Sequence, residues 1–564
     1  MRRRMVAIAA IVTLFLLLGA IGITAGEAVE PNDSDIVYEC AETPPDDFSP
    51  PDAGNETIGW VDGFWYNQPL DMSVDEGLTE DELTNLSART AARVEAMRCL
   101  AFAELPPVEI IDRDEFAAET DEAFAAIGDA ERMADNAQLQ TMLLVGSDVD
   151  SIDVRAEDRT ATVGGYYNFV ENRTVVIADD PDTLQIDEEI LAHELGHALQ
   201  DQHFDLTRYE RPTKDMDAGK LGMIEGDVHR IEQEYLRHCE DGNWSDPCVT
   251  QEQEISGGVE PANWGLYFAN FQPYSDGPSF VETIYDDGGW EAVNAVYEDM
   301  PVSSHQVIYP DQYQEYTEQS LFVPDRSTDD WERLSKETSG DYNVIGQAAM
   351  SAMFMGPAYD DGDPRTGPVV TQEDFLNIDD DDPGMVDASN PINYDLPQTD
   401  GWQADRMYSY TNGDDVATVW KTSWENTAQM ESFKEAYAQL LEYHGGELSE
   451  TYEYTWTFDP QSEFNMAVTL ASDGDQLKIV TAPTVSDLEA VQTDLALEPI
   501  DTDDTNGDFP PPGVGGNTDD TTGIVDDDDH SNDDMADDII PGFGPIAAIV
   551  SLFLAGIAAR TYRT

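Results

Sequence analysis

The chain has 564 residues, of which 117 are Asp or Glu and only 27 are Lys or Arg, so its formal net charge is −90 at pH 7. Nucleic-acid binding is excluded as a main function, because phosphate recognition needs clustered Lys and Arg. Hydrophobic residues make up 40% of the chain, which also excludes a generally disordered acidic polymer and predicts a buried core.

The excess of carboxylates resembles that of proteins from salt-in halophilic archaea, in which molar salt screens the self-repulsion of the surface. The resemblance implies that the fold loosens at low ionic strength. Two acidic runs, at 360–363 and 379–382, could in principle bind Ca²⁺. Neither fits an EF-hand loop, so we interpret them as acidic surface and a calcium site is not supported.

An export signal is predicted at the N-terminus. Three arginines at 2–4 precede an apolar stretch from Met5 to about Gly22, and small residues follow. This order is typical of a signal peptide, which we place at residues 1–26, with Sec and twin-arginine export both open. Residues 27–100 are predicted to be an acidic region with one helix, over Thr79–Phe102. The sequence leaves open whether this region is removed as a propeptide.

Strands are predicted after this region. Val108–Ile111 favours one strand, and Thr160–Val163 with Gly165–Ile177 favours a strand pair that turns around 170–173. This pair immediately precedes the most informative part of the chain.

Residues 187–200 form a proline-free run with a helical apolar rhythm, and the run contains His193-Glu194-Leu195-Gly196-His197. Helix positions four residues apart lie on one face, so His193 and His197 can bind one metal ion. Glu194 projects beside that ion, where a carboxylate can take a proton from water. The motif therefore predicts one Zn²⁺ per chain with Glu194 as the catalytic base. The alternative is a pair of core histidines.

A zinc site needs a third protein ligand, and two residues compete for this role. His203 has the spacing of the metzincin pattern, but that pattern needs a helix-breaking glycine at the position of Gln200. In an unbroken helix His203 lies off the metal face. Glu225 lies in a second helical stretch that runs towards Leu236, where a carboxylate can complete the site. We therefore favour Glu225.

The segments His193–His203 and Glu225–Asp227 resemble a family of gluzincin-like metallopeptidases from archaea and bacteria. Shorter similar segments lie between Val108 and Tyr443. The resemblance implies that His193, His197 and Glu225 bind zinc, and that residues 101–320 form a zincin-like peptidase domain. In many zinc peptidases a strand just before this helix edges the cleft and holds peptide substrate by strand addition.

Several further side chains are candidates for supporting roles. Asp227 and Asp201 could accept hydrogen bonds from the ligating histidines, and His229 lies one turn after Glu225. An electrophile that steadies the tetrahedral oxyanion is also expected. The candidates for that electrophile are His305, Tyr309 and Tyr313.

The C-terminal third changes character. Residues 321–400 are predicted to be an acidic, loop-rich connection, and 401–497 follow the order strand, strand, helix, strand, strand, strand, helix. That order predicts an α+β appendage without obvious chemistry of its own. Residues 498–539 are predicted to be a disordered Asp-rich linker, kept extended by self-repulsion.

Residues 540–564 contain Pro541-Gly542-Phe543, an apolar segment and terminal arginines, and resemble the PGF-CTERM sorting signal of archaeal surface proteins. The resemblance implies that an archaeosortase removes the tail and that the new C-terminus becomes lipid-attached. The alternative is a single-pass anchor, and both place the bulk of the chain outside the cell. We expect disulfides there, Cys239 with Cys248 and Cys40 with Cys99. Sequons compatible with glycosylation lie at Asn32, Asn55, Asn85, Asn172 and Asn243.

These patterns together predict an α+β protein with two parts. The first is a zincin-like metallopeptidase domain with cleft-edge strands, an HExxH helix and a second ligand helix, and the second is the α+β appendage. The predicted function is that of an exported, membrane-anchored zinc metalloprotease acting on peptides or proteins. Two alternatives remain: a non-catalytic surface or adhesion protein on the same fold, and a zinc hydrolase of non-peptide amides or esters.

Overall fold

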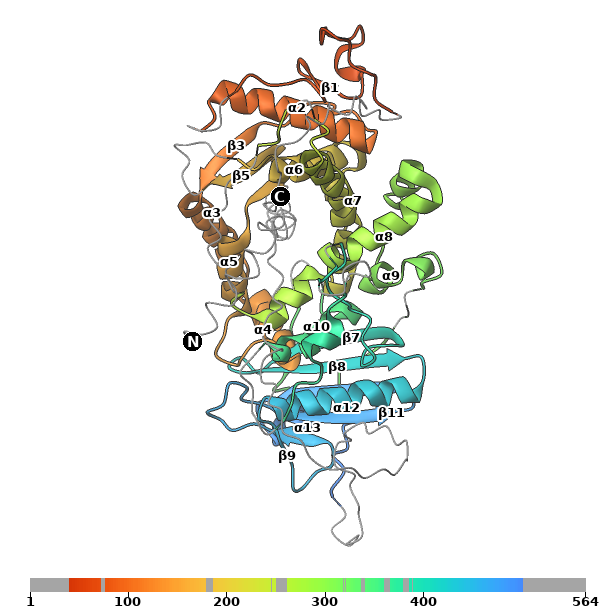
Figure 1. Cartoon of the computed structure of the whole chain (residues 1–564). Coiled ribbons are helices and arrows are strands. Elements are labelled where there is room, and N and C mark those ends of the chain that lie inside the picture. The colour runs from red at the N-terminus through yellow and green to blue at the C-terminus, as the bar shows by residue number, and fades with distance from the viewer. Residues whose placement is uncertain are drawn as a thin grey trace, which may run out of the picture. The chain divides into compact units, whose positions relative to one another are not determined.

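Helices and strands alternate along the chain in a computed structural model, which is mixed α+β as the sequence predicts (Figure 1). The structure describes residues 40–72, 77–178, 186–244, 246–249, 261–317, 319, 321–335, 340–359, 366–378, 385–387 and 389–500. The predicted signal peptide, the sorting tail, nearly all of the Asp-rich linker and the acidic runs at 360–363 and 379–382 lie outside these ranges. Among the helices in these ranges, none is long and apolar enough to cross a bilayer.

The N-terminal part is built around helix α2 (Glu80–Arg98). Thr79 starts the helix through a capping box with Glu82, and Cys99 ends it in the left-handed region at φ 62°. Cys99 is joined to Cys40 by a disulfide, as predicted. Three short elements precede α2: η1 (Gly54–Glu56), β1 (Trp60–Val61) and β2 (Phe64–Trp65).

A three-stranded sheet in the order β3-β5-β4 lies next along the chain. β3 runs parallel to β5 and β4 runs antiparallel to it, so β4 is an edge strand of the described sheet. Helices α3, α4 and α5 fill the connection between β3 and β4. The bounds are β3 (Val108–Asp112), α3 (Arg113–Ala125), α4 (Asp129–Thr141), α5 (Ser151–Thr162), β4 (Gly165–Asn168) and β5 (Arg173–Ala178).

One strand prediction is wrong. Residues 160–163 are not a strand, because α5 runs up to Thr162. Asp150 starts this helix by accepting the N–H of Ile152, and the Arg159 guanidinium lies 5.0 Å from the centre of the Phe116 ring on α3. Tertiary packing therefore outweighs the strand preference of the β-branched residues at its end.

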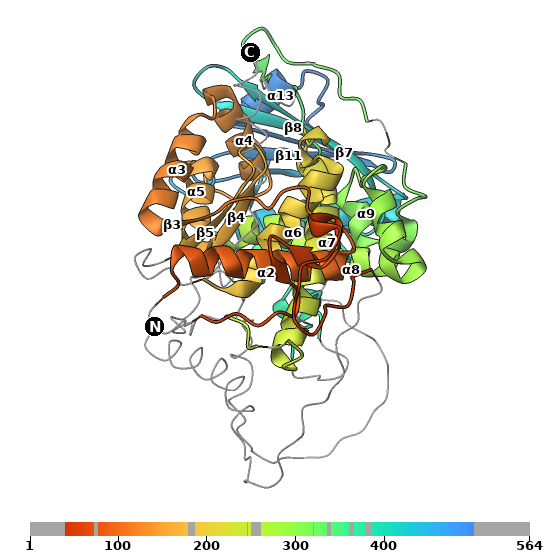
Figure 2. The ribbon, with the colours of Figure 1, turned by 90° about the horizontal axis from the view of Figure 1, so that it is seen from above.

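Three long helices follow: α6 (Glu188–Phe204), α7 (Lys214–Glu240) and α8 (Trp264–Val296). Helix α8 has a kink at Gly288 and Gly289, where the backbone is not helical. Helix α2 packs on both α6 and α7 (Figures 1 and 2). One buried apolar cluster joins the four helices and includes Leu86, Val94, Leu191, Leu195, Ile224 and Phe280.

The C-terminal part contains a seven-stranded antiparallel sheet in the order β6-β7-β8-β12-β11-β10-β9. After residue 401 the elements follow the predicted order, apart from the additional two-residue strand β9. Their bounds are β6 (Glu332–Arg333), β7 (Trp402–Thr411), β8 (Val416–Trp424), α12 (Thr427–Tyr443), β9 (Glu447–Leu448), β10 (Thr455–Thr457), β11 (Ala467–Asp473), β12 (Gln476–Ala482) and α13 (Val485–Val491).

Short elements connect α8 with this sheet. Helix α10 is buried along its whole length and packs against α8. The second predicted disulfide, Cys239–Cys248, closes the loop after α7. The elements that connect α8 with the sheet are α9 (Ser304–Ile308), η4 (Pro310–Gln312), α10 (Gly346–Met355), η5 (Gly356–Ala358) and α11 (Gln372–Phe375), while η3 (Leu206–Arg208) connects α6 with α7.

Candidate metal centre

Helix α6 carries the two histidines of the motif on one face. Asp187 starts the helix by accepting the N–H of Glu189, so that His193 and His197 lie one turn apart in its regular part. Both side chains are buried, and their Nε2 atoms approach each other to 3.1 Å. The two nitrogens therefore point at a common position.

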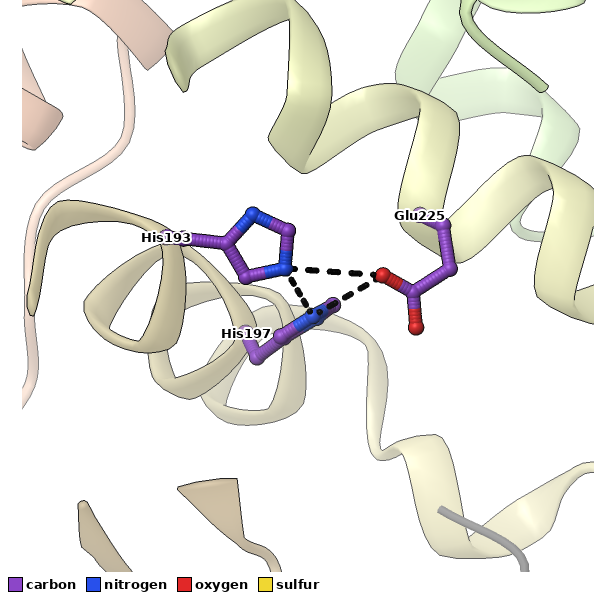
Figure 3. A group of neighbouring side chains, drawn as sticks. All are labelled: His193, His197 and Glu225. Atoms are coloured by element: carbon purple, nitrogen blue, oxygen red, sulfur yellow. Dashed lines mark hydrogen bonds and ion pairs between the residues drawn. The ribbon is translucent and has the colours of Figure 1, made fainter. Parts of the chain in front are cut away.

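Helix α7 brings a carboxylate to the same position (Figure 3). The Glu225 Oε2 atom lies 3.5 Å from His193 Nε2 and 3.3 Å from His197 Nε2. A tetrahedral zinc site with bonds of about 2.0–2.1 Å has ligand atoms about 3.3 Å apart. The three separations, 3.1, 3.3 and 3.5 Å, are close to that value.

The hydrogen bonding of these residues also fits a cation. Within the described residues, the buried Glu225 carboxylate makes no hydrogen bond of ordinary geometry, and its ion-pair contacts are those with His193 and His197. A buried carboxylate needs a positive partner to compensate its desolvation, and a cation between these three side chains would supply one. His193, His197 and Glu225 also form the single group of three or more potential ligands found among the described His, Cys, Asp and Glu side chains. The donor set of two imidazoles and one carboxylate suits Zn²⁺.

Two further side chains orient the imidazoles. The His193 Nδ1 atom lies 2.9 Å from the Glu232 carboxylate, and His197 Nδ1 lies 3.0 Å from the Gln200 side-chain oxygen. Gln200 is itself held because its amide donates to the Ile224 carbonyl at 2.9 Å. Each Nδ1 thus has a polar partner, which turns each Nε2 towards Glu225.

The charges in this group act strongly on one another. Burial alone would raise the pKa of Glu225, but His197 and His193 lower it to about 2. Burial would lower the pKa of each histidine, yet the neighbouring carboxylates outweigh that effect and raise both values. The surroundings of the two histidines accordingly favour a positive charge. A protonated imidazole or a bound metal ion would each supply that charge.

Glu194 lies beside this group on α6. It is buried, and neither of its carboxylate oxygens makes a hydrogen bond of ordinary geometry to the described residues, while the backbone N–H of Tyr167 on β4 acts to lower its pKa. Burial raises its pKa, while His193 and His197 act in the opposite direction. The edge strand β4 passes close by, because a Cβ placed on Gly165 would lie 3.3 Å from the Glu194 Cγ atom.

A tyrosine from α8 also lies next to the group. Helices α7 and α8 cross at glycines, since a Cβ on Gly226 would lie only 2.2 Å from the carbonyl oxygen of Gly277. Tyr274 precedes this crossing by one turn of α8. Burial raises the pKa of Tyr274 well above its usual value, and the charge of Glu225 raises it further.

The remaining candidates are placed elsewhere. His203 is exposed, and its Nε2 atom lies 2.8 Å from the Ala101 carbonyl oxygen. His305 contacts the Gln347 side chain at 2.7 Å. The hydroxyl of Tyr309 donates to Asp395 and that of Tyr313 donates to the Asp299 carbonyl. The structure brings none of these four residues into the group of ligand atoms.

The acidic candidates for orienting the histidines have other partners. Asp227 is buried against Arg98 and accepts the Tyr297 hydroxyl at 2.6 Å. Asp201 accepts the Tyr167 hydroxyl at 3.1 Å. His229 does approach the site, with Nδ1 3.4 Å from Glu232. Glu232 therefore orients a histidine, which is the role that the sequence suggested for Asp227. Glu232 follows Glu225 by seven residues, and this helical spacing is the one sequence signal that could have indicated its role.

Comparison with known proteins adds one match. A family model described as a domain of unknown function (DUF8575) matches residues 332–492, which cover β6 to α13. No curated protein and no solved structure matches the chain. The metal-ligand candidates on α6 and α7 lie outside the matched segment.

Proposed function

We propose that this protein is an exported, surface-anchored zinc metallopeptidase. The observation that carries the proposal is the triangle of His193, His197 and Glu225, whose ligand atoms are 3.1, 3.3 and 3.5 Å apart. Glu194, the base candidate, lies directly beside it with its carboxylate unpaired among the described residues. A pair of core histidines would explain neither feature, because core polar groups pair with one another.

The chemistry divides between the metal and the protein. A bound zinc ion polarises a carbonyl group and lowers the pKa of a water molecule. His193, His197 and Glu225 would hold that ion, with Glu232 and Gln200 fixing the imidazoles. Glu194 would accept a proton from the attacking water and return it to the leaving amine. Its burial helps, because a raised carboxylate pKa lies closer to the working pH.

The edge strand β4 supports a peptide substrate over a small ester or amide. An extended peptide can pair with the free edge of a strand through main-chain hydrogen bonds. Gly165 lets β4 lie against α6, because a side chain there would meet Ile190 at 2.9 Å. A peptide paired with β4 would pass close to Glu194.

The proposed location outside the cell rests on the N-terminal and C-terminal segments of the sequence, which imply export machinery, an archaeosortase and a membrane anchor as partners. The two disulfides agree with an oxidising exterior. The carboxylate-rich composition adds the expectation that the enzyme works in concentrated salt.

The direct test is the zinc content of the full chain purified in multimolar KCl. We expect one zinc per chain for the wild type and for His203→Ala, and none for Glu225→Ala. His203 is the matched control, because it lies on the motif helix but outside the ligand group. Loss of zinc with His203→Ala alone would favour the metzincin arrangement. Absence of zinc from the wild type would contradict the proposal and favour a non-catalytic surface protein.

A further inference from the structure

Tyr274 has an unusual environment for a tyrosine inside a protein. Its hydroxyl oxygen is buried and makes no hydrogen bond of ordinary geometry among the described residues, and the polar group that acts on it most strongly is the Glu225 carboxylate. Buried tyrosine hydroxyls normally have a partner, and others in this chain do. Tyr297 donates to Asp227, Tyr394 to the Phe268 carbonyl and Tyr437 to the Thr141 carbonyl, each at 2.6 Å.

The crossing of α7 and α8 decides where this hydroxyl lies. A Cβ on Gly226 would lie 2.2 Å from the Gly277 carbonyl oxygen, and a Cβ on Gly277 would lie 2.4 Å from that of Gly222. The two backbones therefore touch without intervening side chains. Glu225 is adjacent to one crossing point and Tyr274 is one turn before the other, so the crossing brings the phenol to the carboxylate.

The ring of Tyr274 is held in place from its own helix. It stacks on Phe271, with ring centroids 6.2 Å apart and planes inclined by 20°. A cleft lined by Ala218, Leu221, Asn270 and Pro273, among others, lies about one turn before Glu225 on α7 and before Tyr274 on α8.

We propose that the Tyr274 hydroxyl donates a hydrogen bond to the substrate carbonyl oxygen as that oxygen becomes negative in the transition state. The proposal rests on the peptidase function proposed above. A donor held ready in a site of low polarity stabilises such an oxyanion without reorganisation. Tyr274 fits this role because its hydroxyl faces the ligand candidate Glu225 and makes no hydrogen bond of ordinary geometry, whereas Tyr309 and Tyr313 donate to groups outside the candidate metal centre.

The test compares Tyr274→Phe with Tyr394→Phe in the full chain in multimolar KCl. Both changes remove one buried hydroxyl near α8, but only that of Tyr394 makes a hydrogen bond. For Tyr274→Phe we expect one zinc per chain, an unchanged Tm and a kcat about a hundredfold to a thousandfold lower, with KM nearly constant. For Tyr394→Phe we expect a lower Tm and an unchanged kcat.

Two measurements separate the proposed role from a structural one. The first is zinc affinity by competition with a chelator, which Tyr274→Phe leaves unchanged if Tyr274 acts on substrate. The second is the affinity for a peptide phosphinate, a tetrahedral analogue built on a peptide that the wild type cleaves. It should fall in Tyr274→Phe by a factor similar to that in kcat, while the affinity for the cleavage products stays constant.

Three outcomes would overturn the proposal. An active wild type with an unchanged kcat in Tyr274→Phe removes this role alone and leaves the peptidase function standing. A parallel fall in zinc affinity would make Tyr274 a positioning residue for Glu225. A wild type that binds zinc but cleaves neither casein nor a mixed peptide library would overturn the peptidase function and this role together.

Discussion

Arg98 and Asp227 form a buried ion pair that joins the N-terminal helix α2 to the ligand helix α7. The Arg98 Nε atom lies 2.8 Å from Asp227 Oδ1, and the two side chains are 1% and 0% exposed. Asp227 follows the ligand candidate Glu225 by two residues. The guanidinium also lies 4.2 Å from the centre of the Trp290 ring on α8. One arginine thus links α2 to both helices that cross beside the candidate metal centre.

Replacing Arg98 by Met should destabilise the protein by about 3–5 kcal/mol, because the Asp227 carboxylate would stay buried without its positive partner. The matched control is Arg132→Met, which breaks ion pairs of a partly exposed arginine with Asp150 and Asp153 and should cost about 1 kcal/mol or less. Urea unfolding in multimolar KCl measures both values. Equal decreases in the free energy of unfolding would mean that the buried ion pair stabilises the protein no more than the partly exposed ones.

Residues 40–99 should be a permanent part of the protein rather than a removable propeptide. Arg89 and Arg93 on α2 are completely buried and both contact Glu188 in the first turn of the motif helix, at 2.9 and 2.7 Å. A chain that begins at residue 101 would leave the buried Glu188 without these partners. We expect that chain to misfold and bind no zinc, while a chain that begins at residue 40 keeps both properties. Near-ultraviolet circular dichroism measures the folding of both chains, and metal analysis measures their zinc content. A chain from residue 101 that folds and binds zinc would contradict the prediction that residues 40–99 are a permanent part of the protein.

Glu194→Gln should keep one zinc per chain and lower kcat by about 10²–10⁴-fold, because the amide cannot take a proton from water. Asp201→Asn is the matched control, since Asp201 lies two turns later on the same helix and contacts Tyr167 instead. Metal analysis and peptide hydrolysis are measured on the same samples. Loss of zinc from Glu194→Gln would assign Glu194 a structural role.

Glu232→Ala should weaken zinc binding about 10–100-fold, because His193 loses the carboxylate that orients it. Glu232→Gln should restore part of the affinity, since its side-chain oxygen can still accept from Nδ1. Glu234→Ala serves as the control on the same helix and should bind zinc like the wild type. Chelator competition gives all the affinities, and an unchanged value for Glu232→Ala would refute the orienting role.

The stability of the protein should fall as the pH rises from about 4.5 to 8. Burial raises the pKa of Glu95 on α2 from 4.5 to about 8, although its carboxylate accepts the N–H groups of Phe102 and Gly59. In this window the folded protein holds a proton that the unfolded chain has released. Glu95 should therefore contribute a decrease in the free energy of unfolding of up to about 1.4 kcal/mol per pH unit, and this contribution should level off above pH 8.

Glu95→Gln should remove this contribution, because the amide accepts the same N–H groups without titrating. Urea unfolding of both proteins at constant KCl across this pH range shows the difference between the two slopes. Identical slopes would mean that Glu95 does not control this part of the pH dependence.

Many of the helices and strands could be predicted from local sequence patterns. The helical rhythm of 187–200 predicted α6 and placed His193, Glu194 and His197 on it, because the spacing of side chains on a helix depends only on nearby residues. The order of elements after residue 401 was also readable from alternating apolar residues and turn signals. The strand predicted at 160–163 was wrong because helix capping and packing outweighed the local preference.

What the sequence by itself determined is therefore the motif and the helix that contains it. Only the tertiary structure decided which distant groups surround it. Glu232 and Gln200 contact the histidines and Tyr274 lies beside Glu225 because helices pack at particular angles, and glycines on two helices allow their backbones to touch. Such contacts join residues that are far apart in the chain. The distance between two residues along the sequence does not predict the angle at which their helices cross.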